Sequence, residues 1–139
     1  IAASMVDKAN TYNRHGDRCT YHVNVNSDLS LFATNSFNFV MTFMVFQHMP
    51  PELVLGYIKE FVRILKPGGV AFFQVPIAGA ESKTQALVAK GETPSMAMFP
   101  TPLEDIREAV KEASGEEVLA EEGDGAPGWV SYHVVIRKR

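Results

Sequence analysis

The sequence FNFVMTF, residues 37–43, decides the fold class because it is almost continuously apolar. A strand that is covered on both faces has this composition, whereas a strand with one solvated face alternates apolar and polar residues. A helix is expected next, with Pro51 in its first turn and an apolar stripe at helical spacing that runs to Leu65. Pro67-Gly68-Gly69 should stop this helix, and residues 70–75 form a second buried strand. Strand, helix and strand together predict a parallel pair in an α/β protein.

The N-terminal third predicts one helix and one strand. Residues 3–13 place Met5 and Tyr12 on one apolar helix face. Residues 20–25 alternate between apolar and polar side chains, which predicts a short strand. Asn26-Ser27-Asp28 then has the composition of a turn.

The C-terminal third predicts a helix and a hairpin. Thr101 and Glu104 have the spacing of a capping box, and the apolar face that follows ends at Gly115. Residues 116–120 and 129–137 read as strands that are close enough in sequence to pair antiparallel. The predicted fold is therefore α/β, with a mostly parallel sheet and an antiparallel C-terminal hairpin in one domain.

Composition excludes several classes of function. Hydrophobic residues make up 46% and charged residues 21% of the 139 residues, as in ordinary globular proteins. The net charge of -3 gives no footprint for nucleic acid or for an anionic membrane. No apolar run approaches the ~20 residues of a membrane span, so a cytoplasmic protein is expected. Cys19 is the single cysteine and the four histidines lack metal-ligand spacing, so no metal site is expected.

Two motifs resemble class I S-adenosylmethionine-dependent methyltransferases. Residues 35–52, NSFNFVMTFMVFQHMPPE, resemble the fourth strand of that family, often written Ser-Phe-Asp-x-Val, with a histidine near the next helix. Residues 63–69, RILKPGG, resemble the Arg-x-Leu-Lys-Pro-Gly-Gly that precedes the fifth strand. The C-terminal helix and hairpin match the sixth and seventh strands, so the resemblance covers the whole chain. Asn38 departs from the usual aspartate, which hints at relaxed constraint.

The resemblance also implies that part of the domain is absent. Ile1, Ala2 and Met5 fit the pattern that follows the second strand of the family. The first strand, its glycine loop and the second strand would then precede residue 1. We therefore expect residues 1–139 to form a single partial methyltransferase domain with a partial Rossmann-like sheet. Such a chain keeps one wall of the crevice in which doubly wound sheets bind ligands.

The resemblance implies S-adenosylmethionine as the cofactor of the parent protein. The adenine side would lie against the N-terminal helix and the turn after the third strand, and the methionine end would lie beyond the fourth strand, where an aromatic face attracts a sulfonium. Each position has a plainer alternative: core packing for the helix and the strand end, and turn formation for the polar residues. The candidate cofactor contacts are Ile1, Met5, Asn26, Asp28, Leu29, Thr42, Phe43 and Met44.

His48 is the candidate catalytic residue, because an imidazole between a strand end and a helix can take a proton near pH 7. The alternative is that it orients the loop or lines the substrate. Methyl transfer needs little covalent help, since holding the reactants in line supplies roughly 7–11 kcal/mol. Residues 77–100, with Met96, Met98 and Phe99, are the expected substrate lid, unless these side chains only pack.

Residues 123–128 match G-x-G-x-x-G, but a strand follows them, so a hairpin turn is predicted in place of a dinucleotide loop. Two functions remain. The parent protein methylates a small molecule with S-adenosylmethionine, or the chain is a catalytically inactive truncated remnant. Such a remnant would pair as a homodimer through the apolar edge of the fourth strand.

Overall fold

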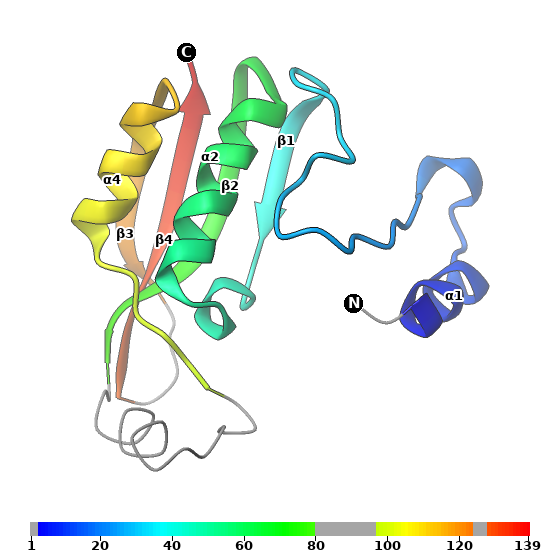
Figure 1. The fold of residues 1–139 in the computed structure, drawn as a ribbon, viewed down its shortest axis with the longest axis horizontal. Coiled ribbons are helices and arrows are strands. Elements are labelled where there is room, and N and C mark those ends of the chain that lie inside the picture. The colour runs from blue at the N-terminus through cyan, green and yellow to red at the C-terminus, as the bar shows by residue number, and fades with distance from the viewer. Residues whose placement is uncertain (1–2, 80–96, 124–127) are drawn as a thin grey trace.

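The computed structural model describes residues 3–79, 97–123 and 128–139 (Figure 1). Two 3-10 turns, Gly16–Arg18 and Phe46–His48, accompany the helices and strands. In chain order the helices and strands are α1 (Ala3–Tyr12), β1 (Phe37–Thr42), α2 (Pro51–Ile64), β2 (Leu65–Gly79), α4 (Leu103–Glu112), β3 (Gly115–Gly123) and β4 (Trp129–Lys138).

The strands form one mixed sheet in the order β1-β2-β4-β3. β1 runs parallel to β2, with Phe39 opposite Val70. β4 runs antiparallel to β2, with His133 opposite Gln74, and it also pairs antiparallel with β3. The α/β class, the parallel strand pair and the C-terminal hairpin are therefore confirmed.

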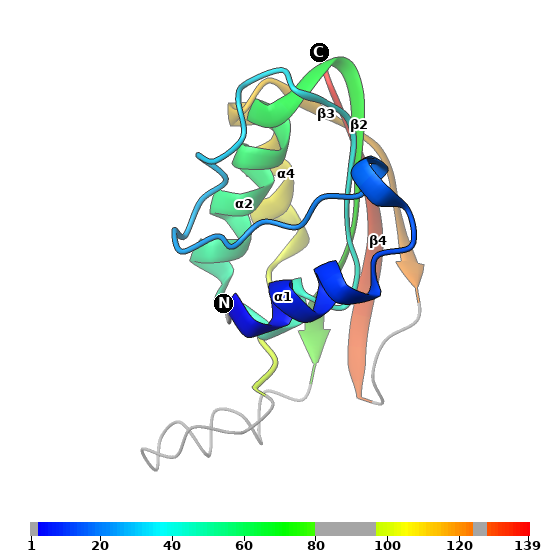
Figure 2. The same cartoon turned by 90° about the vertical axis from the view of Figure 1, so that its right-hand side faces the viewer.

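The core lies between the sheet and two helices. Figures 1 and 2 show α2 and α4 side by side on one face of the sheet. The apolar stripe predicted for α2 is fully buried there, and each such side chain contributes about 1.5–3 kcal/mol. The buried residues of this core are Phe46, Val54, Ile58, Phe61, Val62, Leu65, Ala71, Phe73, Val75, Ile106, Ala109, Val110, Val134 and Ile136.

The junction between α2 and β2 is tighter than predicted. The helix ends at Ile64, and Leu65 is already extended and opposite Phe37 in the ladder. Residues 67–69 therefore lie within β2, at the irregular register between Phe37 and Phe39. A Cβ on Gly69 would come within 2.9 Å of the Lys66 carbonyl oxygen, so only glycine fits this bend.

The other face of the sheet is open where it meets β1. Phe39 and Met41 are 55% and 63% exposed. The expectation that both faces of this strand are covered is therefore wrong for the part of the chain that the structure describes. Both helices that pack on the sheet lie on the opposite face (Figure 2), and α1 stands apart from the body in Figure 1. The apolar side chains of β1 pack against the core on one face only.

Two N-terminal predictions fail for the same reason. The helix forms as expected, but Met5 and Tyr12 are 62% and 77% exposed because α1 buries none of its residues. Residues 20–25 are irregular, and the four-stranded sheet does not include them. An apolar pattern indicates which face of a helix or strand can be buried. That face is buried only where another part of the protein packs against it.

The prediction of a capping box at Thr101 is also wrong. The Thr101 N–H donates to the Pro76 carbonyl at 2.8 Å, which turns this buried residue towards the sheet. Among the described residues its hydroxyl has no hydrogen-bond partner. Pro102 is the N-cap of α4 and makes no side-chain cap. The sequence also suggests a short helix around residues 82–89, and these residues lie outside the described ranges.

The basic C-terminus, Arg137-Lys138-Arg139, could be read from sequence alone as a solubilising tail, but Lys138 has a structural role. Lys138 belongs to β4, and its Nζ donates to Asn35 Oδ1 at 2.9 Å and to the Arg63 carbonyl at 3.1 Å. The end of β4 is thereby tied to the turn before β1. Within the described ranges, no helix combines the length and apolar character needed to cross a membrane.

Candidate functional site

Residues 42–44 lie at the carboxyl end of β1, at the end of the sheet where the parallel strands β1 and β2 finish. β1 and β2 point the same way, so their carboxyl ends lie at the same edge, where open α/β sheets bind ligands. Thr42 is the last residue of β1, and Phe43 and Met44 follow it exposed. Met44 has a φ of 57°, a left-handed conformation that costs a non-glycine residue about 1–2 kcal/mol. Strain of this kind is typical of functional sites.

Phe43 lies across the open face of the sheet. Its ring stacks on Phe72 with centroids 6.4 Å apart and lies 5.9 Å from the ring of His133. The Phe43 ring is therefore held by β2 and β4 while almost half of the side chain faces solvent. An aromatic face fixed in this way can attract a cation.

The polar turn before β1 forms as predicted. Asp28 Oδ1 accepts from the Ser30 N–H at 3.0 Å, and the Asn26 N–H donates to Asn24 Oδ1 at 3.0 Å. Hydrogen bonds from Ser30 lower the pKa of the exposed Asp28 carboxyl below its ordinary value. The turn therefore presents an ionised carboxylate to solvent.

A partly buried ion pair on α2, between Glu60 and Arg63, holds this turn in place, and the sequence analysis missed it. Glu60 Oε2 accepts from the Leu29 N–H at 2.9 Å, and Arg63 Nη2 donates to the Leu29 carbonyl at 2.9 Å. Arg63 also donates to the Phe32 carbonyl at 3.0 Å and to Glu60 at 2.7 Å. The hydrogen bond from Arg63 lowers the pKa of Glu60, and the one to Glu60 raises the pKa of Arg63. Their spacing of three residues on a predicted helix was the available signal.

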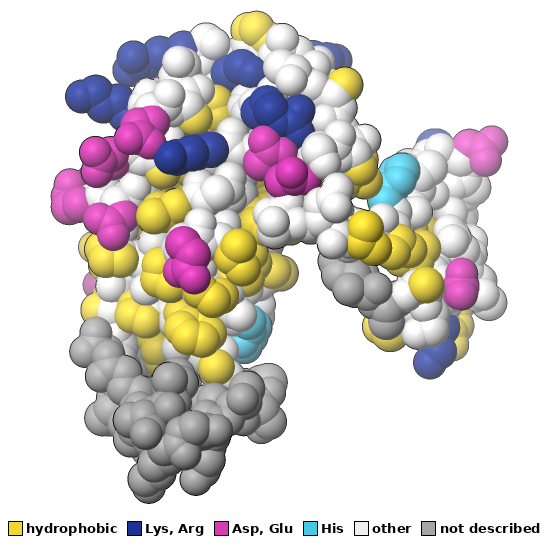
Figure 3. Space-filling model, in the orientation of Figure 1, with side chains coloured by type: hydrophobic (Ala, Val, Ile, Leu, Met, Phe, Trp, Pro, Cys, Tyr) yellow, Lys and Arg dark blue, Asp and Glu magenta, His cyan; other side chains and the backbone are white. Residues whose placement is uncertain are grey.

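An apolar pocket separates this turn from β1. It has a volume of about 270 Å³. In Figure 3 hydrophobic side chains gather over the lower half of the body, towards the carboxyl ends of β1 and β2. Leu29 belongs to both the turn and the pocket, so the predicted adenine side lies next to β1. The lining residues are Leu29, Phe32, Phe37, Phe39, Val40, Phe61 and Ile64.

His48 is engaged through both ring nitrogens. Nδ1 lies 3.1 Å from the Ala97 carbonyl, which can only accept, so Nδ1 carries the hydrogen. Nε2 lies 3.0 Å from Gln47 Nε2 and accepts from that amide. The Gln47 carbonyl also accepts from the Phe99 N–H at 2.9 Å. These bonds fit the loop-orienting alternative, because the lone pair that a general base needs is occupied.

The remaining predicted residues are not gathered at this edge. Met5 lies exposed on α1, apart from the body, and Ile1 lies outside the described residues. Met98 and Phe99 are half-buried beside the Phe46–His48 turn, whereas Met96 is outside the described residues. The structure places Leu29 of the turn beside α2 and β1, and it places Met5 apart from them on α1.

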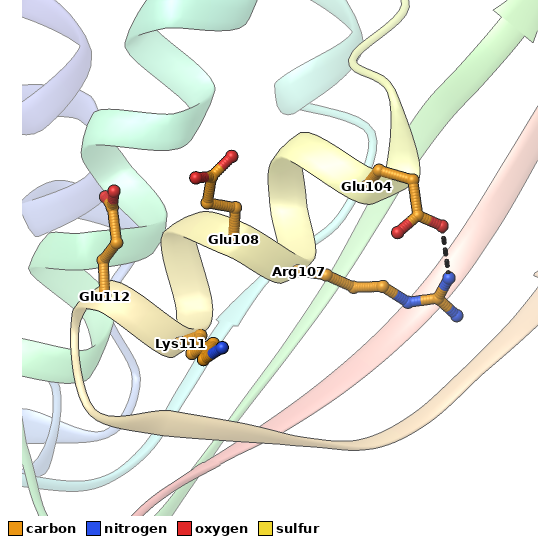
Figure 4. Close-up of a pocket in the computed structure, with 5 residues that line it drawn as sticks. All are labelled: Glu104, Arg107, Glu108, Lys111 and Glu112. Atoms are coloured by element: carbon orange, nitrogen blue, oxygen red, sulfur yellow. Dashed lines mark hydrogen bonds and ion pairs between the residues drawn. The ribbon is translucent and has the colours of Figure 1, made fainter.

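A hollow on α4 offers a different surface. Figure 4 shows five charged side chains, all from this one helix, spread along its outer side. Arg107 is paired with Glu104 at 2.7 Å and with Glu117 at 3.0 Å. Because these groups diverge into solvent and pair with neighbours, the hollow is a solvated helix face.

The comparison with protein families decides the assignment. The family described as "Methyltransferase domain" matches residues 1–73, more than half of the chain. The chain belongs to this family. The match runs from α1 to the middle of β2, so it contains the strained strand end and the polar turn. No curated protein matches the sequence significantly.

Solved methyltransferases share the fold of this methyltransferase domain. A candidate sarcosine dimethylglycine methyltransferase from Galdieria sulphuraria superposes with a TM-score of 0.72 at 17% identity, over 99% of this chain and 67% of its own. A SAM-dependent methyltransferase from Methanosarcina mazei gives 0.67 at 17%, over 99% and 79%. Magnesium protoporphyrin IX methyltransferase from Synechocystis, solved with SAH, gives 0.69 at 15%, over 100% and 61%. The partial Rossmann-like methyltransferase sheet is thereby confirmed.

Proposed function

We propose that this chain is a single partial methyltransferase domain whose parent protein transfers a methyl group from S-adenosylmethionine to a small molecule. The observation that carries the proposal is the left-handed backbone of Met44 beside the exposed ring of Phe43, at the carboxyl end of parallel strands. The chain spans 61–79% of the methyltransferases compared above, which supports a partial domain.

The residues present fit such a cofactor. An ionised Asp28 and a neighbouring apolar pocket suit a ribose hydroxyl and an adenine ring, and the Phe43 face suits a positive charge. Asn26, Asp28 and Leu29 would hold the adenosine side, and Thr42, Phe43 and Met44 the methionine side. Ile1 and Met5 complete the proposed set from the N-terminal helix. When bound, the cofactor supplies an electrophilic methyl group on sulfur.

The chain's own residues then have a positioning task. Glu60 and Arg63 fix the turn, the strained strand end orients Phe43, and the open sheet face leaves room for an acceptor. Alignment of the acceptor atom with the methyl group accounts for most of the rate gain expected. His48, whose ring nitrogens are both bonded, would serve by holding the segment around Ala97.

Calorimetric titration of the 139-residue chain with S-adenosylmethionine and S-adenosylhomocysteine tests this function. We expect micromolar binding of both. Phe43→Ala should weaken the sulfonium ligand by about 3- to 30-fold and the neutral ligand less, because only the former has a cation–π partner. Tyr21→Ala, which removes another exposed ring, is the matched control. Absence of binding up to millimolar ligand would overturn the proposal for this chain.

A second candidate is an inactive remnant that self-associates. Among the described strands, β1 pairs on one edge only, and residues 29–51 contain no Asp, Glu, Lys or Arg. Natural edge strands usually carry such charges to prevent pairing. Light scattering should show a dimer that Met41→Lys converts to a monomer, with Lys66→Ala as a control; a monomeric wild-type chain would dismiss this candidate.

A further inference from the structure

The helix α1 has an apolar face that its own chain leaves uncovered in the part that the structure describes. Met5, Ala9 and Tyr12 recur at helical spacing and therefore lie on one side of the helix. Met5 and Tyr12 are 62% and 77% exposed, and no residue of α1 is buried. A helix with an apolar stripe normally packs that stripe against another surface. The stripe on α1 therefore needs a partner.

The segment between α1 and the body holds the helix away from its own sheet. Asn13 Nδ2 donates to the Cys19 carbonyl at 3.0 Å, which fixes the bend after the helix. The His22 ring lies edge-on to Phe32, with centroids 5.3 Å apart, and the polar turn that follows is bonded to α2. In Figure 1 α1 lies beyond the β1 edge of the sheet, on the side away from α4. Folding α1 back onto its own sheet would disrupt these contacts.

The open face of β1 is a surface of matching chemistry. Phe39 and Met41 project from it and are 55% and 63% exposed. Residues 29–51 contain no Asp, Glu, Lys or Arg, so an apolar helix that docks here strips water from no carboxylate, ammonium or guanidinium group. Asp7 lies on the side of α1 opposite Met5 and stays in solvent when the apolar stripe docks. Each chain thus carries one unpartnered helix face and one unpartnered sheet face.

We propose that α1 of one copy packs on the open face of β1 in a second copy, in a symmetric exchange of the N-terminal helices. Such an exchange is a low-cost route to a dimer, because it makes the same contact twice. A buried aromatic side chain contributes about 150–250 Å², and stable interfaces bury about 1,200–2,000 Å². With Tyr12 and Phe39 as the aromatic residues of each contact, the interface is small, so the dimer is weak and forms at high protein concentration.

This contact differs from pairing through the edge of β1, because it uses side chains on the face of the strand. It does not rest on the proposed methyl transfer. It does bring α1 of one copy to the strand that ends at Phe43 in the other, the side of the proposed cofactor site from which Met5 stands apart within a single chain.

Light scattering of the 139-residue chain over a concentration series tests the exchange. The mass should rise from monomer to dimer, and Tyr12→Lys should weaken the dimer by at least about 10-fold because it places a charge in an apolar contact. Asn10→Lys is the matched control, since it adds the same charge to the other side of α1 and should leave the dimer unchanged. Both residues are exposed in the single chain, so neither change should disturb its fold. A monomer throughout the series, or a dimer that survives Tyr12→Lys, would overturn the proposal.

Paramagnetic broadening in NMR spectra shows which molecule provides the helix. A nitroxide is attached to Asp7→Cys in a Cys19→Ser chain without isotopes, and this chain is mixed with isotope-labelled wild-type chain. The amides of residues 39–43 in the isotope-labelled chain should broaden, and adding Tyr12→Lys to the nitroxide chain should abolish the effect. Broadening only when nitroxide and isotope share one chain would show that α1 folds back on its own sheet. A dimer without broadening between chains would assign the contact to the β1 edge. Either result would overturn the exchange, and neither measurement includes S-adenosylmethionine, so the proposed function is tested separately.

Discussion

The two faces of the sheet are made by the same strands but meet different surroundings. On the face towards α2 and α4, Phe73 and Ile136 are fully buried. On the opposite face, Phe39 and Met41 are as apolar and remain largely exposed. The difference shows that an apolar pattern specifies what a strand can bury, whereas the fold determines what it does bury. It also leaves the strand end and its aromatic neighbours accessible.

Truncating one phenylalanine on each face gives the largest expected contrast. Phe73→Ala should lower the free energy of unfolding by about 3–5 kcal/mol, because it leaves a cavity in the core. Phe39→Ala on the exposed face should cost well under half of that. Urea unfolding of both variants measures the comparison. Equal losses would show that the open face is covered in solution.

The ion pair on α2 should give the next largest effect. Glu60→Gln replaces charge-assisted hydrogen bonds to Leu29 and Arg63, so we expect a loss of about 1–3 kcal/mol. Because folding lowers the pKa of Glu60, its contribution is present above the ordinary value near 4.5 and is lost as the pH falls through the lower folded value. Unfolding curves between pH 3 and 7 measure this. Glu104→Gln, at an exposed pair on α4, is the control that should leave stability unchanged; a matching loss there would refute a special role for Glu60.

The strain at Met44 should give the smallest effect, and with opposite sign. Met44→Gly should raise stability by up to about 1 kcal/mol, because glycine adopts the left-handed conformation without penalty. Met41→Gly, in the regular part of β1, should destabilise. Thermal unfolding compares the two. If strain at Met44 serves binding, the stabilised variant should also bind S-adenosylhomocysteine more weakly, and unchanged affinity would assign the strain to the turn alone.

Local patterns predicted most of the body of the fold. The stripe from Val54 to Val62 predicted α2, and the spacing of the last two strands predicted their hairpin, since both depend on neighbours close in sequence. The strand at 20–25 and the burial of Met5 could not be judged in this way, because each needs a partner surface that the pattern does not name. Thr101 was misread because a distant carbonyl, that of Pro76, determines its orientation.

Only the local features of the candidate site could be predicted from the sequence, because its other features depend on contacts between distant residues. The positions of Phe43 and Met44 follow from the end of a strand, and the turn at Asn26–Asp28 follows from its composition. The left-handed backbone of Met44 and the partners of His48 do not, since Ala97 is 49 residues away from that histidine. The bond between Glu60 and Leu29 spans 31 residues and could be inferred only from the fold.

Amide chemical-shift mapping with S-adenosylhomocysteine tests the central claim most directly. The account predicts that shifts concentrate at residues 42–44 and 26–29, and that the charged outer side of α4 at residues 104–112 is unaffected. Shifts confined to α4, or an unchanged spectrum at millimolar ligand, would contradict a cofactor site at the carboxyl end of β1.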